Sequence, residues 1–173
     1  MLRRNLLLAA LVALGVGLVS TIRAPERRTG FFAVRGHRVF GVPAHAVTGV
    51  TVVLGPQRFE AERRGETWTI DGAAATPGTA DALRDLVTTL AGLRSVDVFR
   101  ARDGAGYGLD RPHGSIEVGT ARVRRRLDLG ELTAGGGTVY ARRTGDPRVM
   151  QIGTGLLSTL QRVLYERDRR SAP

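Results

Sequence analysis

The 173-residue chain contains no cysteine. This absence excludes disulfide bonds, thiol nucleophiles, thiolate metal sites and a lipid-attachment cysteine, but it does not distinguish between redox compartments. Aromatic residues make up only 5% of the chain, so the core must be built mainly from Val, Leu, Ile and Ala. The contents of 42% hydrophobic and 24% charged residues indicate a globular protein, and the length allows one ordinary domain.

Lysine is also absent, so all 26 basic residues are arginine, and the formal net charge is +10. Clustered cations bind phosphates by releasing counterions, which raises nucleic acid as a partner. However, the arginines are spread along the chain, and no recognition helix, zinc finger or aromatic RNA-binding pattern accompanies them. We therefore expect attraction to an anionic membrane surface rather than nucleic-acid binding. A basic module that binds other anionic polymers is an alternative.

The chain has only three histidines: His37, His45 and His113. No HExxH motif or Asp-rich loop accompanies them, so we expect no metal site. The glycine-rich stretch Gly104–Gly108 does not match a dinucleotide fingerprint, because Leu109 stands where a third glycine is needed and Pro112 opposes the required helix. A phosphate-binding loop needs a lysine. We therefore expect no cofactor.

An uncharged apolar run, Leu6–Ile22, follows Arg3 and Arg4. At about 1.5 Å per residue it approaches the length needed to cross a hydrocarbon core of about 30 Å. A cleaved signal peptide is the alternative, but Val19-Ser20-Thr21 is a poor match to a small-x-small cleavage site. The sequence therefore favours an uncleaved signal anchor over residues 1–23 that binds the lipid bilayer through residues 6–22.

The charges around this run predict its orientation. Two arginines near the N-terminus favour a cytoplasmic N-terminus and an extracytoplasmic C-terminal domain. We expect a bacterial inner membrane, with the domain in the periplasm. Pro and Gly within residues 24–30 discourage helix continuation and predict a juxtamembrane linker. The folded domain is expected over residues 31–167, followed by a basic tail over residues 168–173.

Short β-branched runs separated by Gly and Pro turns follow the linker. They predict strands over Val39–Val42, Val47–Leu54, Arg58–Arg63, Thr67–Ile70, Val96–Phe99, Ile116–Val118, Val123–Leu129, Val139–Arg142 and Val149–Ile152. Leucines recur at helical spacing over Leu83–Leu93, with Thr79 as the expected N-cap, and over Leu156–Leu164. The order of strands, helix, strands, helix predicts an α+β domain with an antiparallel sheet and helices covering one face.

Several short motifs resemble one known family. The motif Tyr107-Gly108-Leu109-Asp110-x-Pro112 precedes a predicted hairpin that ends in Leu129-Gly130. The stretch Gly137–Arg142 and an amphipathic helix follow, and a Trp68-Thr69-Ile70 strand precedes the first helix. Over residues 40–167 these features resemble domain-of-unknown-function family 4340. The resemblance implies an envelope protein with one N-terminal transmembrane helix, often encoded beside ABC transporters of the gliding-motility type, and it supplies no catalytic residues.

An aspartate, a histidine and a serine stand close together in the same motif region: Asp110, His113 and Ser115. The members of a hydrolytic triad normally come from distant positions, because adjacent residues on an extended chain point apart. We therefore interpret Tyr107–Pro112 as a structural turn in which Asp110 accepts hydrogen bonds from nearby backbone N–H groups. The alternative is an envelope hydrolase or carbohydrate-active enzyme that uses Asp110 or His113 with a second carboxylate such as Glu131 or Asp146.

The densest basic cluster is Arg122, Arg124, Arg125 and Arg126. On a strand Arg122, Arg124 and Arg126 share one face, which is either solvated or in contact with an anionic surface such as lipid headgroups or an acidic partner. Arg125 falls on the apolar face. There we expect its long side chain either to extend past the edge of the sheet to solvent or to pair with Asp128 or Glu117.

The sequence thus predicts a single-pass, membrane-anchored accessory protein without catalytic activity. Its expected partner is another envelope protein, such as a subunit of an ABC transporter.

Overall fold

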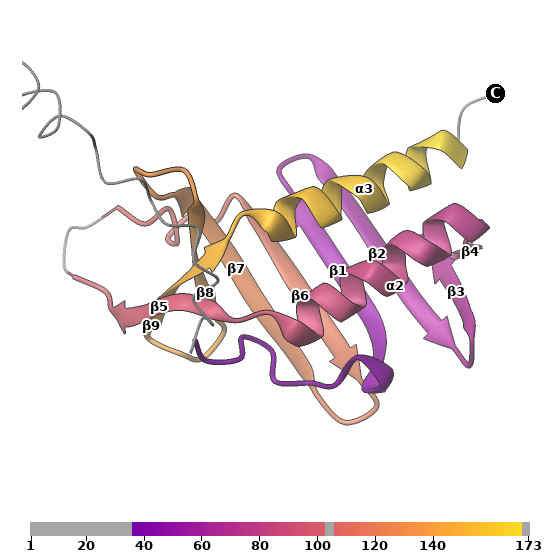
Figure 1. Cartoon of the computed structure of the whole chain (residues 1–173), viewed down its shortest axis with the longest axis horizontal. Helices are drawn as coiled ribbons and strands as arrows, with labels where there is room; N and C mark the ends of the chain where they lie inside the picture. The colour runs from indigo at the N-terminus through magenta and orange to yellow at the C-terminus, as the bar shows by residue number, and fades with distance from the viewer. Residues whose placement is uncertain (1–35, 103–105, 171–173) are drawn as a thin grey trace, which may run out of the picture. The chain divides into compact units, whose positions relative to one another are not determined.

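The computed structural model describes residues 36–102 and 106–170 of the chain. The predicted anchor over residues 1–23 and the linker over 24–30 lie outside the described residues. Within the described ranges, no helix has both the length and the hydropathy needed to span a bilayer. This part of the chain folds as an α+β domain in which two long helices cover one face of an antiparallel sheet (Figure 1).

The sheet has nine strands. Their bounds in chain order are β1 (Val47–Leu54), β2 (Gln57–Arg64), β3 (Thr67–Ile70), β4 (Ala73–Ala74), β5 (Ser95–Arg100), β6 (Gly114–Thr120), β7 (Arg124–Leu132), β8 (Thr138–Arg143) and β9 (Arg148–Gly153). The helices are η1 (Ala44–Ala46), α2 (Pro77–Gly92) and α3 (Gly155–Arg170).

The strand order is β4-β3-β2-β1-β6-β7-β8-β9-β5, and each neighbouring pair is antiparallel. The strands β1 and β6 lie side by side at the centre, and each begins a four-strand meander that runs outward and ends in a long helix (Figure 1). The exception is β5, which follows α2 in the first half of the chain but pairs with β9, the last strand of the second half. The predicted order of strands, helix, strands, helix is therefore confirmed.

The alternation of side chains explains which face of the sheet is buried. In β2, Phe59 and Ala61 are fully buried, whereas Arg58, Glu60 and Glu62 between and beside them are exposed. A strand with this period of two buries one face and leaves the other in solvent. The buried face meets apolar stripes of α2 and α3, and the core between them is mostly aliphatic, as the low aromatic content predicts.

The start of α2 differs from the sequence prediction. Thr76, not Thr79, is the N-cap: its side-chain oxygen accepts a hydrogen bond from the backbone N–H of Thr79, at 3.2 Å. Pro77 occupies the first turn, where its missing N–H costs nothing, so the proline begins the helix rather than preceding it. Thr79 is fully buried, and its hydroxyl donates a hydrogen bond to the carbonyl oxygen of Glu166 in α3, at 3.3 Å.

Other predicted bounds also differ. The predicted strand Val39–Val42 is wrong: only an isolated bridge joins Arg38 to Arg94, and the residues after it run through the core without sheet pairing. The strand predicted from Val123 begins one residue later, because Val123 belongs to a turn in which its carbonyl accepts a bond from Thr120 N, at 2.8 Å. At the other end α3 continues to Arg170, so residues 168–170 of the expected tail are helical.

Candidate functional site

The turn formed by Tyr107–Pro112 is held against β7 by backbone contacts. The N–H of Glu131 donates to the carbonyl of Tyr107 at 2.9 Å, and Leu109 is buried, with 5% exposure. Gly108 has a φ of +66°, which glycine tolerates without strain. A Cβ atom at Gly130 would lie 2.0 Å from the Tyr107 carbonyl oxygen. Gly108 in the turn and Gly130 in β7 therefore allow the backbone of the turn to cross close over the backbone of β7.

The hydrolase candidates do not converge in the described residues. Asp110 and His113 are exposed, Ser115 is buried in β6, and no hydrogen bond among the described residues joins their side chains. The hydrogen bonds that Asp110 is predicted to accept from backbone N–H groups are likewise not found among the described residues. The backbone of His113, not its imidazole, is engaged: its N–H donates to Leu129 and its carbonyl accepts from Gly55, both at 2.9 Å.

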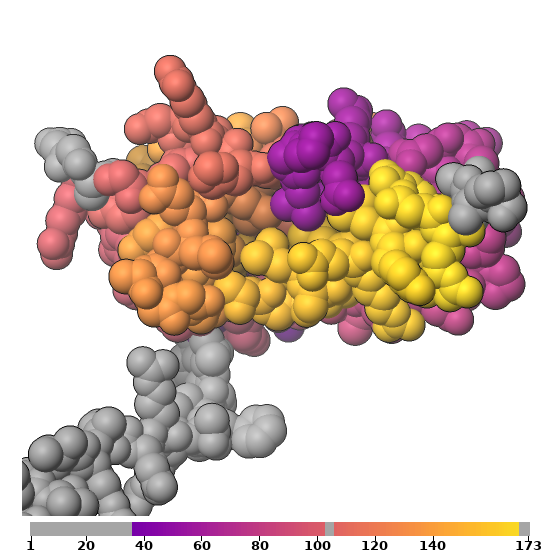
Figure 2. All heavy atoms as spheres, turned by 90° about the horizontal axis from the view of Figure 1, so that it is seen from above, coloured from indigo at the N-terminus to yellow at the C-terminus, as the bar shows by residue number. Residues whose placement is uncertain are grey.

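The residue His113 lines an apolar hollow of about 330 Å³. Leucines from the end of β1, from β7 and from the start of α3 form its walls, and Leu132 is 56% exposed beside it. Figure 2 shows α3 in yellow lying along this side of the domain, next to the orange β7–β8 region. No group of three or more His, Asp or Glu residues suited to a metal ion occurs in the described part of the chain.

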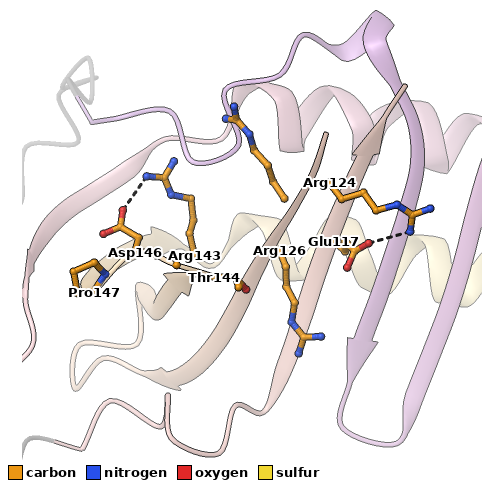
Figure 3. Close-up of a pocket in the computed structure, with 9 residues that line it drawn as sticks. Glu117, Arg124, Arg126, Arg143, Thr144, Asp146 and Pro147 are labelled. Carbon is orange, nitrogen blue, oxygen red and sulfur yellow. Dashed lines mark hydrogen bonds and ion pairs between the residues drawn. The ribbon is translucent and has the colours of Figure 1, made fainter. Parts of the chain in front are cut away.

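A larger pocket lies where β7 extends past β8. At the start of β7, the first residue paired with β8 is Leu127, opposite Arg143. Arg124, Arg125 and Arg126 therefore extend past the end of β8. The pocket measures about 560 Å³ (Figure 3). Its lining residues, which define the arginine pocket, are Glu117, Arg124, Arg125, Arg126, Arg143, Thr144, Gly145, Asp146 and Pro147.

Two arginines on the outer face of β7 are balanced by carboxylates. Arg124 contacts Glu117 at 3.2 Å, and Arg126 contacts Asp128 at 2.9 Å. Both guanidinium groups are half or more exposed, so these pairs contribute little to stability. Arg122, which we placed on the same face, lies instead in the turn before β7 and does not line the pocket.

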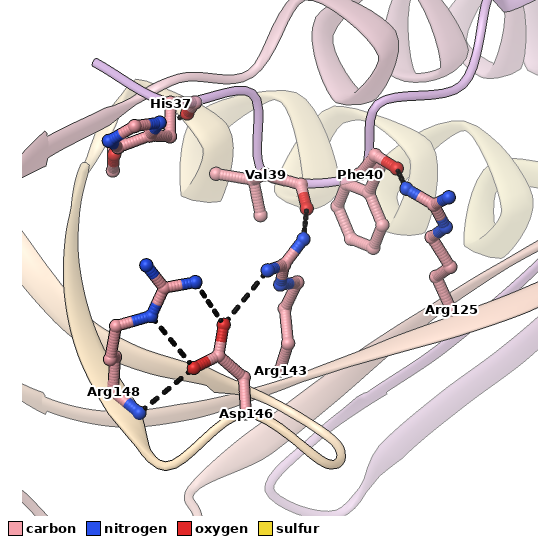
Figure 4. Close-up of polar contacts among 8 residues, drawn as sticks. His37, Val39, Phe40, Arg125, Arg143, Asp146 and Arg148 are labelled. Carbon is pink, nitrogen blue, oxygen red and sulfur yellow. Dashed lines mark hydrogen bonds and ion pairs between the residues drawn. The ribbon is translucent and has the colours of Figure 1, made fainter. Parts of the chain in front are cut away.

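Arg125 and Arg143 lie on the other side of the pocket, beneath the segment that precedes η1 (Figure 4). Arg125 is half-buried and donates to the carbonyl of Phe40. The predicted pairing of Arg125 with Asp128 or Glu117 is wrong, because other arginines occupy both carboxylates. Among the described residues Arg125 forms no ion pair. Arg143 donates to the carbonyl of Val39 at 3.4 Å and to Asp146 at 2.8 Å.

Asp146 is held by two arginines. The Arg148 side chain donates hydrogen bonds to both carboxylate oxygens, at 3.0 and 2.9 Å, and the Arg148 backbone N–H donates to one of them, at 3.0 Å. Arg143 donates a fourth hydrogen bond (Figure 4). These hydrogen bonds, those from the Arg148 side chain first, hold the pKa of Asp146 well below its usual range, and the same contact raises the pKa of Arg148. Asp146 is therefore ionised at neutral pH and does not supply a proton as a general acid.

Only part of this site follows from the sequence. Arg124, Arg125 and Arg126 belong to the predicted basic cluster, whereas Arg143 and Arg148 were not predicted. A signal for them is present in the stretch Arg142–Arg148, where arginines flank an Asp-Pro turn, a pattern that brings both sides of a hairpin to one carboxylate.

Comparison with known families gives one match. The family described as Domain of unknown function (DUF4340) matches residues 68–166, more than half of the chain. The chain belongs to this family. The matched DUF4340 region runs from β3 into α3 and includes both the Tyr107–Pro112 turn and the arginine pocket. No curated protein and no solved structure matches the chain significantly.

Proposed function

We propose that this DUF4340 protein is a membrane-anchored, extracytoplasmic accessory protein that binds other envelope components and has no catalytic activity of its own. Its expected protein partner is a subunit of an ABC transporter. The anchor is the apolar run Leu6–Ile22, and the transporter follows from what the family resemblance implies.

The arginine pocket is the observation that carries the binding role. Arginine stays protonated at all physiological pH values, so its side chain donates hydrogen bonds but does not act as a general base or a nucleophile. The two carboxylates in the lining, Glu117 and Asp146, are both committed to arginines. A pocket with this chemistry is suited to hold an anionic group and offers no residue to react with it.

Affinity purification tests the accessory role. The tagged full chain is solubilised from native membranes in mild detergent, and the co-purifying proteins are identified by mass spectrometry. A tagged segment of residues 1–35 is the control for proteins recruited by the anchor alone. We expect a transporter subunit or another envelope protein to be enriched with the full chain over the control. Repeated recovery of the chain without any such protein contradicts the proposal.

A further inference from the structure

We propose that the arginine pocket is a binding site for a phosphate group, carried by an anionic lipid headgroup or free in solution. This inference goes beyond the accessory role and does not depend on the identity of a protein partner.

Four arginines line the pocket against two carboxylates, Glu117 and Asp146. Glu117 pairs with Arg124, and Asp146 is shared between Arg143 and Arg148. Arg126 pairs with Asp128, which lies outside the lining, so among the described residues Arg125 is the lining arginine without a carboxylate. Elsewhere on the outer face arginines lie beside carboxylates, as in Arg58–Glu60 at 3.9 Å and Arg64–Glu62 at 3.8 Å. The pocket is therefore a place where cationic charge exceeds anionic charge.

Arg125 is a partly buried residue whose side chain donates to a backbone carbonyl rather than to a carboxylate. Taking a cation partly out of water without an anion is unfavourable, and an incoming anion removes that cost. The carbonyls of Val39 and Phe40, neighbours in sequence, accept hydrogen bonds from Arg143 and Arg125, so one segment holds both arginine side chains in place (Figure 4). Such fixed donors bind an anion without first having to be ordered.

These donors suit a phosphate better than a carboxylate. A carboxylate has two oxygens and is saturated by one or two guanidinium forks, as Asp146 already is. A phosphate offers additional acceptor oxygens and can bridge several guanidinium groups at once. The hydroxyl of Thr144 lines the same pocket and is a further donor for such a ligand.

Lipid headgroups are one source of such a phosphate group, because the predicted anchor, Leu6–Ile22, belongs to the same chain. An anionic leaflet attracts cationic side chains near its surface.

Calorimetric titration of the full chain in a neutral detergent tests the site. The ligands are inorganic phosphate, dihexanoyl phosphatidylglycerol, dihexanoyl phosphatidylcholine and a hexaglutamate peptide. The test variant is Arg125→Gln, whose amide can still donate to Phe40. The matched control is Arg111→Gln, which removes one charge from an exposed arginine outside the pocket.

We expect phosphate or phosphatidylglycerol to bind the wild-type chain, and Arg125→Gln to weaken that binding about tenfold or more, which corresponds to about 1.4 kcal/mol. Arg111→Gln is expected to stay within about twofold, because distant surface charges are screened. Binding of phosphatidylglycerol but not of free phosphate assigns the site to lipid headgroups, and binding of free phosphate alone assigns it to a soluble anion.

Two results overturn the inference. One is equal binding of inorganic phosphate or phosphatidylglycerol by wild type and Arg125→Gln. The other is that neither of these two ligands binds; binding of hexaglutamate in that case assigns the pocket to an acidic protein segment. The urea midpoint of Arg125→Gln, followed by Trp68 fluorescence, shows that the variant is folded. Neither result bears on the co-purification experiment, so the two proposals can fail separately.

Discussion

Replacing Gly130 with alanine tests whether the close crossing of the Tyr107–Pro112 turn over β7 stabilises the domain. An added Cβ atom would lie 2.0 Å from the carbonyl oxygen of Tyr107 and 3.1 Å from Cδ2 of Leu109. Real Cβ atoms do not approach so closely, and a backbone carbonyl moves only when its segment moves. We therefore expect Gly130→Ala to lift the turn off the strand.

The expected cost follows from the interactions that the turn makes. Leu109 is 5% exposed, and exposing a buried leucine costs about 2 kcal/mol. The hydrogen bond from Glu131 N to Tyr107 O contributes about 1 kcal/mol. The ring of Tyr107 packs against two other aromatic rings, with centroids 5.6 and 5.0 Å away, and each contact adds about 0.5 to 1.5 kcal/mol. Gly130→Ala should therefore lower the free energy of unfolding by about 4 to 6 kcal/mol if all of these contacts are lost.

Urea unfolding of the full chain in neutral detergent measures this change. Trp68 is the only tryptophan and is 3% exposed, so its fluorescence reports loss of the core. The matched control is Gly135→Ala, because a Cβ atom there meets no atom within 4 Å. A Gly130→Ala protein whose unfolding free energy lies within about 0.5 kcal/mol of the control would refute the reasoning.

Four further changes have defined outcomes. The folded-state pKa of Asp146 is depressed, so its contribution to stability is present above the unfolded pKa of about 3.9 and is lost as the pH falls below that value. The urea midpoints of wild type and Asp146→Asn should therefore differ at pH 7 and converge on acidification. A difference that stays constant with pH would count against the arginine contacts. Leu86→Ala empties a fully buried site of α2 and should cost about 2 to 5 kcal/mol in the same urea assay, whereas a loss below about 1 kcal/mol would contradict the packing. Thr76→Ala removes the N-cap of α2 and should cost about 1 kcal/mol by thermal unfolding, while Thr76→Asn should retain most of the stability. Asp110→Ala combined with His113→Ala should leave both folding and cellular function unchanged, and loss of function in a folded double variant would favour the hydrolase alternative.

Local pattern was sufficient to predict most strands and both long helices. The strands Val47–Leu54 and Thr67–Ile70 were predicted with the bounds that the structure has, because each is a short run of strand-forming residues that a turn closes off. The segment Val39–Val42 has the same β-branched composition but packs into the core without a strand on either side. The apolar composition of this segment predicts that it is buried. Whether a buried segment also forms hydrogen bonds with a neighbouring strand depends on the tertiary structure.

The arginine pocket could be predicted only in part. Arg125 meets Phe40 across 85 positions of sequence, and Arg143 meets Val39 across 104. No local spacing encodes such contacts. Alternation along β7 did indicate that Arg125 faces inward, but its partner, a carbonyl of an irregular segment, depends on how the chain before β1 crosses the sheet.

The pairing of β5 with β9 makes the two halves of the domain interdependent during folding. The segment Ser95–Arg100 leaves the first half and takes its place only beside Arg148–Gly153, the final strand to be synthesised. Cutting the chain between the halves would leave one fragment with an unpartnered strand and the other with an open edge, so each fragment should need its complement to become ordered. Contacts that span so much sequence also slow folding, because a long loop must close before the two strands can pair.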